Sequence, residues 1–212
     1  MVRAILDGRK TCTRRVIKPQ PQSGLCYTYA GSHKGCIGKW TYPNRGAHEF
    51  WGEEYKLPEN IKDEELSKRW NPPYHTDDIL YVRETYGEGY EDGTYIYRAD
   101  DKLADLHTFN ESSKLIYHPS IHMPKGAARI WLKVTDVRVE RLREISAESA
   151  LAEGADKYIH TNGGLDENMT ITSFIGIWNS TIKKSDIDRY GWDANPYVWV
   201  IGFERCEKPE GV

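Results

Sequence analysis

Alternating apolar and polar residues mark several β-strands along the chain. Residues 11–17 and 197–206 are rich in β-branched and aromatic side chains, and each stretch predicts one strand. The mostly apolar residues 79–85 predict a buried strand. Residues 94–98 follow a turn formed by residues 91–93, so we expect a hairpin at this point.

The longest strand signal covers residues 129–142. Apolar residues occupy the even positions up to Val134 and the odd positions from Val137 onward. A regular strand cannot keep one face buried through such a change, because its side chains alternate between two faces. The pattern therefore predicts a bulge or a sharp bend near residues 135–136.

Capping residues and helical spacing predict three helices. A short helix over residues 2–7 is ended by Gly8, because glycine accepts the left-handed conformation that follows many helices. Ser146 is suited to begin a second helix, which Gly154 closes. Apolar residues at helical spacing predict a third helix over residues 172–183.

Two stretches lack a clear period, and we interpret them as loop-rich insertions. They cover about residues 19–73, with one short helix over residues 64–70, and about residues 86–126. A chain of 212 residues suits a single domain over residues 1–206 that contains both insertions. We expect the tail, residues 207–212, to be disordered.

Strands dominate this order of elements, and the helices are peripheral. The pattern predicts a mainly β protein of the α+β class. A small, mostly antiparallel β-barrel decorated by helices satisfies it with few assumptions.

Composition excludes one class of protein and leaves others open. Lys and Arg number 29 against 32 Asp and Glu, a net charge of −3 that argues against a general DNA-coating protein. The 7 Trp and 14 Tyr suit base-stacking surfaces as well as a β-rich core. No signal peptide or membrane-spanning apolar run is evident, so we expect a cytoplasmic protein with no membrane partner.

The four cysteines match no disulfide framework, so we expect reduced thiols. Cys26, His33, Cys36 and His48 resemble a set of zinc ligands, but their spacing matches no standard zinc motif. We therefore expect no metal site, and nothing in the sequence indicates a cofactor or sets the oligomeric state.

A cationic cluster stands out against the slightly acidic average. Residues 8–15 place one lysine and three arginines after a glycine turn, together with two threonines. This cluster predicts a surface site for an anionic or polar ligand. Ordinary solvated surface is the alternative interpretation.

The cluster and three later segments resemble one known family, the ASCH domains. Residues 8–15, Gly-Arg-Lys-Thr-Cys-Thr-Arg-Arg, resemble the family signature of Gly-x-Lys followed closely by Thr and Arg. Residues 78–82 resemble the family's Gly-Asp-x-Leu-x-Val element, residues 134–146 its Val-Thr-x-Val-x-x-Leu run, and residues 197–203 its last strand. The resemblance covers roughly half of the chain and implies a PUA-like β-barrel. With its two insertions, the chain is similar to the longer ASCH-type proteins of bacteriophages.

One ASCH branch also resembles the chain in its chemistry. It consists of small amidohydrolases that remove the acetyl group from N4-acetylcytidine. The resemblance places their catalytic residues at Lys10, Thr13 and Glu153, and their arginine at Arg15. The chain departs from them at residues 12 and 14, a cysteine and an arginine where aliphatic residues are usual. The resemblance implies that the partner is a modified nucleoside or RNA.

The residue types themselves allow an amide hydrolysis. Thr13 can act as the nucleophile if Lys10 takes its proton, and Glu153 can protonate the leaving amine or position water. In a regular strand Lys10 and Thr13 would lie on opposite faces, so the turn after Gly8 must fold Lys10 back. Three flanking arginines are candidates for binding the substrate: Arg9, Arg14 and Arg15.

Two carboxylates and a histidine complete the candidate residues. Glu153 falls at the C-terminal end of its predicted helix, where the dipole disfavours an anion. A nearby cation such as Lys10 would offset this cost, and the alternative is that the carboxylate is tolerated on a solvated surface. Glu84 is interpreted first as a member of an ion pair, and alternatively as a carboxylate that binds a nucleobase. His122 is a candidate for lining the site or for acid–base work, with a structural role as the alternative.

Three classes of function follow from these observations. The first is an amidohydrolase acting on an N4-acylated cytidine or a related nucleoside. The second is an RNA-binding module without that chemistry, or a ribonuclease. The third is a phage protein that acts on a partner through its insertions.

Overall fold

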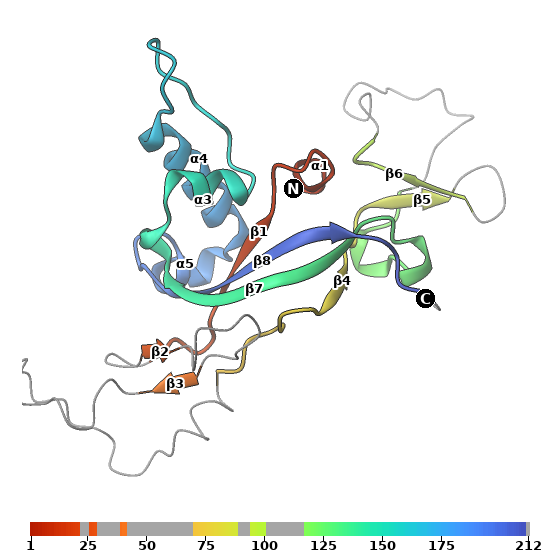
Figure 1. The fold of residues 1–212 in the computed structure, drawn as a ribbon, viewed down its shortest axis with the longest axis horizontal. Coiled ribbons are helices and arrows are strands. Elements are labelled where there is room, and N and C mark those ends of the chain that lie inside the picture. The colour runs from red at the N-terminus through yellow and green to blue at the C-terminus, as the bar shows by residue number, and fades with distance from the viewer. Residues whose placement is uncertain (22–25, 29–38, 42–69, 89–93, 101–116, 211–212) are drawn as a thin grey trace, which may run out of the picture.

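The computed structural model describes residues 1–21, 26–28, 39–41, 70–88, 94–100 and 117–210 (Figure 1). Its main sheet has four antiparallel strands, in the spatial order β1 (Cys12–Val16), β8 (Tyr197–Cys206), β7 (Trp131–Arg141) and β4 (Ile79–Tyr81). Two small sheets pair β2 (Cys26–Thr28) with β3 (Lys39–Thr41) and β5 (Tyr86–Glu88) with β6 (Tyr95–Tyr97). The main sheet is strongly curled, so the described strands form a half-barrel with mainly β character.

The strands β7 and β8 form the longest pairing in the half-barrel. The pairing shifts register between Val134 and Asp136, which leaves Thr135 as the bulged residue. This confirms the irregularity predicted from the change of apolar parity. A bulge increases the local twist and bends the strand, and it accounts for much of the curl.

The strand β4 is shorter and more exposed than the sequence predicts. It covers only residues 79–81 of the expected stretch 79–85, and Ile79 is 42% exposed. β4 pairs with β7 alone, so it is an edge strand of the described sheet. The prediction of a buried strand is therefore wrong, because an apolar run does not distinguish an edge strand from a central one.

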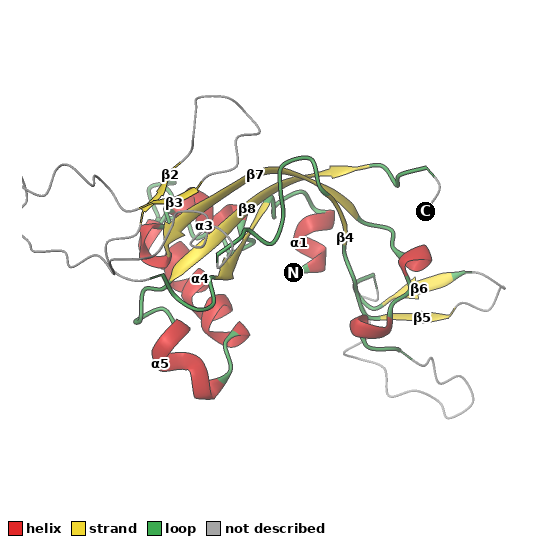
Figure 2. Ribbon diagram, turned by 90° about the horizontal axis from the view of Figure 1, so that it is seen from below, coloured by secondary structure: helices red, strands yellow, loops and turns green. Residues whose placement is uncertain are grey.

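The predicted helices near both ends of the chain are confirmed. They are α1 (Val2–Leu6), α3 (Ala147–Ala152) and α4 (Glu167–Thr181). A further short helix, α5 (Ile187–Tyr190), follows α4 in the chain. The described residues also contain four single turns of 3-10 helix: η1 (Ser120–His122), η2 (Lys125–Ala127), η3 (Leu142–Glu144) and η4 (Lys184–Asp186). Figure 2 shows α1 beneath the arch of β7 and β8, between α3–α5 and the β5–β6 hairpin.

The helix α4 begins five residues earlier than predicted. The Asp166 side chain accepts a hydrogen bond from the Met169 amide and caps the helix. The apolar spacing that suggested a start at Thr172 marks only the part of the helix that packs into the core. Phe174 and Trp178 are the large buried side chains of this part.

Both faces of the curled sheet carry a hydrophobic core. One face packs around Val134, Trp199 and Ile201, together with Ile17 and Trp70. The opposite face carries Val198 and Val200, which pack against Leu142 and against the α4 residues Phe174 and Trp178. Residues of β1 alternate between these two cores, and this alternation decides which of its side chains can meet.

The insertions and the tail are described only in part. The second insertion contains the β5–β6 hairpin, η1 and η2, so it has more regular structure than predicted. The hairpin expected around residues 94–98 is confirmed by the pairing of β5 with β6. The short helix predicted over residues 64–70 lies, except for Trp70, outside the described residues. Residues 207–210 of the tail are described outside any helix or strand, and residues 211–212 are not among the described residues.

Candidate functional site

The turn at Gly8 carries the chain from α1 into β1 and sets the position of Lys10. Gly8 has φ +72°, the left-handed conformation that favours glycine. The Lys10 amide then donates to the carbonyl of Ala4 at 2.8 Å, and the Thr11 amide to that of Ala152 at 2.8 Å. The backbone around Lys10 is therefore held between α1 and the last turn of α3.

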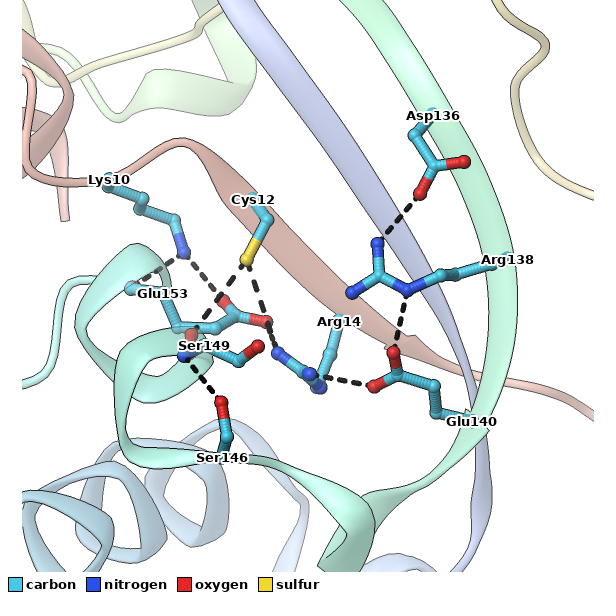
Figure 3. Close-up of polar contacts among 9 residues, drawn as sticks. All are labelled: Lys10, Cys12, Arg14, Asp136, Arg138, Glu140, Ser146, Ser149 and Glu153. Atoms are coloured by element: carbon cyan, nitrogen blue, oxygen red, sulfur yellow. Dashed lines mark hydrogen bonds and ion pairs between the residues drawn. The ribbon is translucent and has the colours of Figure 1, made fainter. Parts of the chain in front are cut away.

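The Lys10 ammonium and the Glu153 carboxylate form a buried ion pair (Figure 3). Nζ lies 2.7 Å from Glu153 Oε2 and 2.7 Å from the Glu153 backbone carbonyl, and each residue is only 4% exposed. The contact confirms that a cation offsets the unfavourable place of Glu153 at a helix C-terminus. Withdrawing both ions from water is costly, so the pair depends on this close geometry.

The ends of α3 are both fixed by local signals in the sequence. The Ser146 side chain accepts from the Ser149 amide at the N-terminus. At the C-terminus Glu153 is followed by Gly154, which has φ +91°. A Cβ atom at Gly154 would lie 3.2 Å from Ala4 Cβ, so the glycine also lets α1 approach α3 closely.

Arg14, on β1, reaches the same Glu153 carboxylate as Lys10. Its NH1 group lies 3.4 Å from Glu153 Oε1, and its NH2 group lies 2.8 Å from Glu140 Oε2 on β7. Glu140 also accepts from Arg138 Nε at 2.6 Å, and Arg138 NH1 donates to Asp136 at 2.7 Å. The six side chains alternate in charge without interruption, as Figure 3 shows.

Cys12 lies beside this chain and is buried. Its Sγ atom is 4.0 Å from Arg14 NH1 and 3.9 Å from the Ser149 carbonyl. Burial, followed by the charge of Glu153, raises the pKa of the thiol to about 11, although Arg14 and Lys10 act in the opposite sense. Cys12 is a free thiol that is protonated at neutral pH, which makes it a poor nucleophile.

Thr13 lies on the other face of β1. It pairs with Ile201 in the β1–β8 register, whereas Cys12 and Arg14 pair with Gly202 and Val200. Residues opposite each other share a face, so Thr13 sits on the Ile201 side, away from Glu153. The turn at Gly8 does not return Lys10 to this face, and no hydrogen bond in the described part of the chain joins Thr13 to Lys10 or Glu153. The structure thus brings together two of the three predicted catalytic residues.

The predicted surface cluster at residues 8–15 is divided by the fold. Lys10 and Arg14 are buried and neutralised by carboxylates, so the expectation that the whole cluster forms a surface site is wrong. Arg9 and Arg15 are exposed, and Arg9 has a long contact of 3.4 Å with Asp7. The composition of the cluster could not show this, because the partners of the buried cations are more than 100 residues away in the sequence.

Glu84 forms an ion pair of its own, as its first interpretation predicted. The carboxylate is 3% exposed and receives two hydrogen bonds from Arg129, at 2.8 and 2.9 Å. The Arg129 guanidinium also stacks on the Tyr97 ring, 3.9 Å from its centroid. These contacts raise the pKa of Arg129, chiefly through its hydrogen bond to Glu84.

His122 lies in the exposed turn η1, and its backbone carbonyl accepts from the Tyr86 hydroxyl at 3.3 Å. This contact fixes the turn against β5 and supports the structural interpretation of His122. No hydrogen bond or ion pair among the described residues joins Glu84 or His122 to the Lys10–Glu153 pair.

The sequence interpretation missed Asp136, Arg138 and Glu140. They occupy alternate positions of the long β7 strand, between the apolar residues Val137 and Val139. Three charged residues at alternate positions, separated by the apolar residues Val137 and Val139, are the signal that identifies them. These three side chains and Arg14 lie on the same face of the sheet, so their charged groups can contact Arg14 across β8.

Metal and membrane interactions receive no support from the described residues. No group of three or more His, Cys, Asp or Glu side chains in this part is arranged to hold a metal ion. Of the possible zinc ligands, His33, Cys36 and His48 lie outside the described residues. None of the described helices is long and apolar enough to cross a membrane.

Comparison with known proteins adds no relative: no family model, curated protein or solved structure matches the chain. The chemical interpretation therefore depends on geometry. The site offers a carboxylate with one lightly occupied oxygen, Glu153 Oε1, beside an ammonium with two of its three N–H groups committed. Such a pair can activate water and stabilise a developing oxyanion.

Proposed function

We propose that the protein is an ASCH-type amidohydrolase that binds an N4-acylated cytidine at the Lys10–Glu153 pair and hydrolyses its amide. The observation that supports this most directly is the burial of both ions at the junction of α1, β1 and α3, 2.7 Å apart. The curled antiparallel sheet with peripheral helices is consistent with a PUA-like barrel. Of the residues that resemble the family signature, Gly8 and Lys10 lie at this junction, whereas Thr13 lies on the other face of β1.

In the proposed reaction, water rather than Thr13 is the nucleophile. The water oxygen bonds to the amide carbon while its proton passes to Glu153 Oε1, and the carbonyl oxygen becomes an oxyanion. The third N–H group of the Lys10 ammonium stabilises this oxyanion. The C–N bond then breaks, Glu153 returns the proton to the N4 nitrogen, and cytidine and acetic acid are released.

Access to the pair requires a local movement, because both residues are almost fully buried. We place this movement at α1, which packs over the pair through Ala4. A helix of five residues has little stability of its own, so the cost of the movement lies mainly in separating Ile5 from the core residues Ile130, Leu132 and Phe203. The Arg3 side chain, which donates to the Ala99 carbonyl at 2.7 Å, contributes to holding α1 closed.

The test is acetate release from N4-acetylcytidine, followed by proton NMR. The proposal predicts stoichiometric acetate and cytidine, with little hydrolysis of N-acetyllysine amide as an unrelated acetamide. If neither substrate is hydrolysed, the proposal is wrong. Equal hydrolysis of both would show a general amidase without nucleoside recognition.

RNA binding without hydrolysis is a second candidate, and a separate observation favours it. Three cations lie over aromatic rings at the α5 end of the molecule: Lys18 over Tyr190 at 4.4 Å, Arg141 over Tyr197 at 3.7 Å and Arg143 over Trp192 at 5.9 Å. Lys18 and Arg143 are exposed, although Arg143 also pairs with Asp193, and exposed cations beside aromatic rings suit phosphates and stacked bases. Salt-sensitive binding of a single-stranded oligonucleotide that is weakened in a Lys18→Ala/Arg143→Ala variant would support this candidate.

A further inference from the structure

The ion pair of Lys10 and Glu153 is the buried end of a longer chain of charges. We propose that Arg14 is a positioning residue, which orients the Glu153 carboxylate, and that Glu140 and Arg138 orient Arg14 in turn. The catalytic meaning of this relay rests on the proposed function, whereas the orientation of Glu153 is testable without any substrate.

The distances show which contact fixes the Arg14 guanidinium. Its bond to Glu140 is 2.8 Å long, while its contacts with Glu153 Oε1 and Cys12 Sγ are 3.4 and 4.0 Å. Its Nε atom is buried without a hydrogen-bond partner. Glu140 therefore holds the guanidinium most firmly, and Glu153 receives a group that is already oriented.

The chain becomes steadily more exposed away from Arg14. The side-chain exposure is 1% at Arg14, 22% at Glu140, 35% at Arg138 and 48% at Asp136. Glu140 uses one oxygen for Arg14 and the other for Arg138, so neither oxygen is free to turn away. The more exposed contact between Arg138 and Glu140 thus stabilises the buried contact between Glu140 and Arg14.

The strand register explains why the relay reaches across β8. Arg14 and Arg138 both pair with Val200, from the two sides of β8, and Glu140 pairs with Val198. These residues share a face, and the small β-branched side chains between them leave room for the long charged ones. The Arg14 guanidinium is also 6.0 Å from the centre of the Phe174 ring, which limits its movement toward α4.

The effect on Glu153 follows from this geometry. Arg14 lies next to Oε1, the oxygen proposed to activate water, while Lys10 binds Oε2. If the guanidinium rotates away, the carboxylate can turn about its terminal torsion, which is soft. The residue at position 14 must also span two carboxylates, which a lysine ammonium cannot do with the same geometry.

The experiment compares the Glu153 side-chain carboxyl carbon signal in ¹³C NMR spectra of the full chain, assigned by its loss in Glu153→Gln. Glu140→Ala and Arg14→Lys are expected to shift this signal, whereas Glu140→Gln should shift it less, because its one amide oxygen still accepts from Arg14 although its NH2 group cannot accept from Arg138. Glu204→Ala, an exposed glutamate on β8, is the matched control. Glu140 is partly exposed, so its variants should fold even if the Arg14 variant does not.

An unchanged Glu153 signal in Glu140→Ala would overturn the relay, whatever the activity of the protein. If the wild type releases acetate, the relay further predicts a kcat about 10-fold lower in Glu140→Ala, with an unchanged KM and partial recovery in Glu140→Gln. Equal kcat values in the wild type and Glu140→Ala would contradict the positioning role. If the wild type releases no acetate while the signal still shifts as expected, the proposed function fails and the relay stands.

Discussion

The Nζ atom of Lys10 lies 2.7 Å from Glu153 Oε2, although 143 residues separate the two in the sequence. Glu153 faces two cations, because Arg14 approaches its other oxygen. Removing the carboxylate therefore leaves more uncompensated charge than removing the lysine, since Arg14 remains for Glu153 in the second case.

We expect Glu153→Ala to lower the free energy of unfolding by about 3–5 kcal/mol, and Lys10→Met to lower it by less. Urea unfolding followed by circular dichroism measures both values. If Lys10→Met were the more destabilising variant, the contact of Arg14 with Glu153 would be energetically unimportant.

Cys12 makes stability depend on pH in the alkaline range. Its folded-state pKa of about 11 lies above the usual 9.0, because burial disfavours the thiolate. This stabilisation is fully present below pH 9 and is lost as the pH rises from 9 to 11, by about 1.4 kcal/mol per pH unit. Between these values the wild type should lose more stability than Cys12→Ala. Parallel curves for the two proteins would show that the thiol is not held in its neutral form.

The two glycines that flank the site differ in their surroundings. Gly8 and Gly154 both have positive φ, but an added Cβ meets nothing within 4 Å at Gly8 and lies 3.2 Å from Ala4 Cβ at Gly154. Gly8→Ala should cost only the conformational strain, about 1–2 kcal/mol. Gly154→Ala should cost more, because α1 must also move. Thermal unfolding of the two variants measures the difference, and equal losses would show that α1 does not pack tightly against α3.

The bidentate bond between Arg129 and Glu84 stabilises the contact of the β5–β6 hairpin with the rest of the chain. Arg129→Lys keeps the charge but loses one hydrogen bond to a buried carboxylate, which costs about 1.5–3 kcal/mol. Arg9→Lys, at an exposed pair, should change stability by less than about 1 kcal/mol. Urea unfolding compares the two, and equal effects would mean that Glu84 is not held by both of its oxygens.

Local signals in the sequence predicted the elements around the site well. Ser146 and Gly154 mark the two ends of α3, and the change of apolar parity located the bulge beside Asp136. These signals depend on neighbouring residues, so the sequence carries them directly. The position of Lys10 against Glu153 followed from two signals, the helix dipole, which favours a cation near this carboxylate, and the resemblance that placed both residues in one site.

Features that depend on register were harder to predict. The face on which Thr13 lies follows from the conformation of the turn after Gly8, and a single residue of change there would reverse it. Arg14 pairs with Glu140 across β8, and no local sequence pattern identifies Glu140 as its partner. The exposure of β4 likewise depends on its place at the edge of the sheet rather than on its apolar residues.

The decisive measurement is acetate release by matched variants. Lys10→Met and Glu153→Gln should lose at least about 100-fold in rate on N4-acetylcytidine, as expected for groups that stabilise an oxyanion and transfer a proton. Thr13→Ala, Lys133→Met and Glu204→Gln should keep rates close to the wild type. Full activity in Lys10→Met or Glu153→Gln, or loss of activity in Thr13→Ala alone, would contradict the proposed reaction.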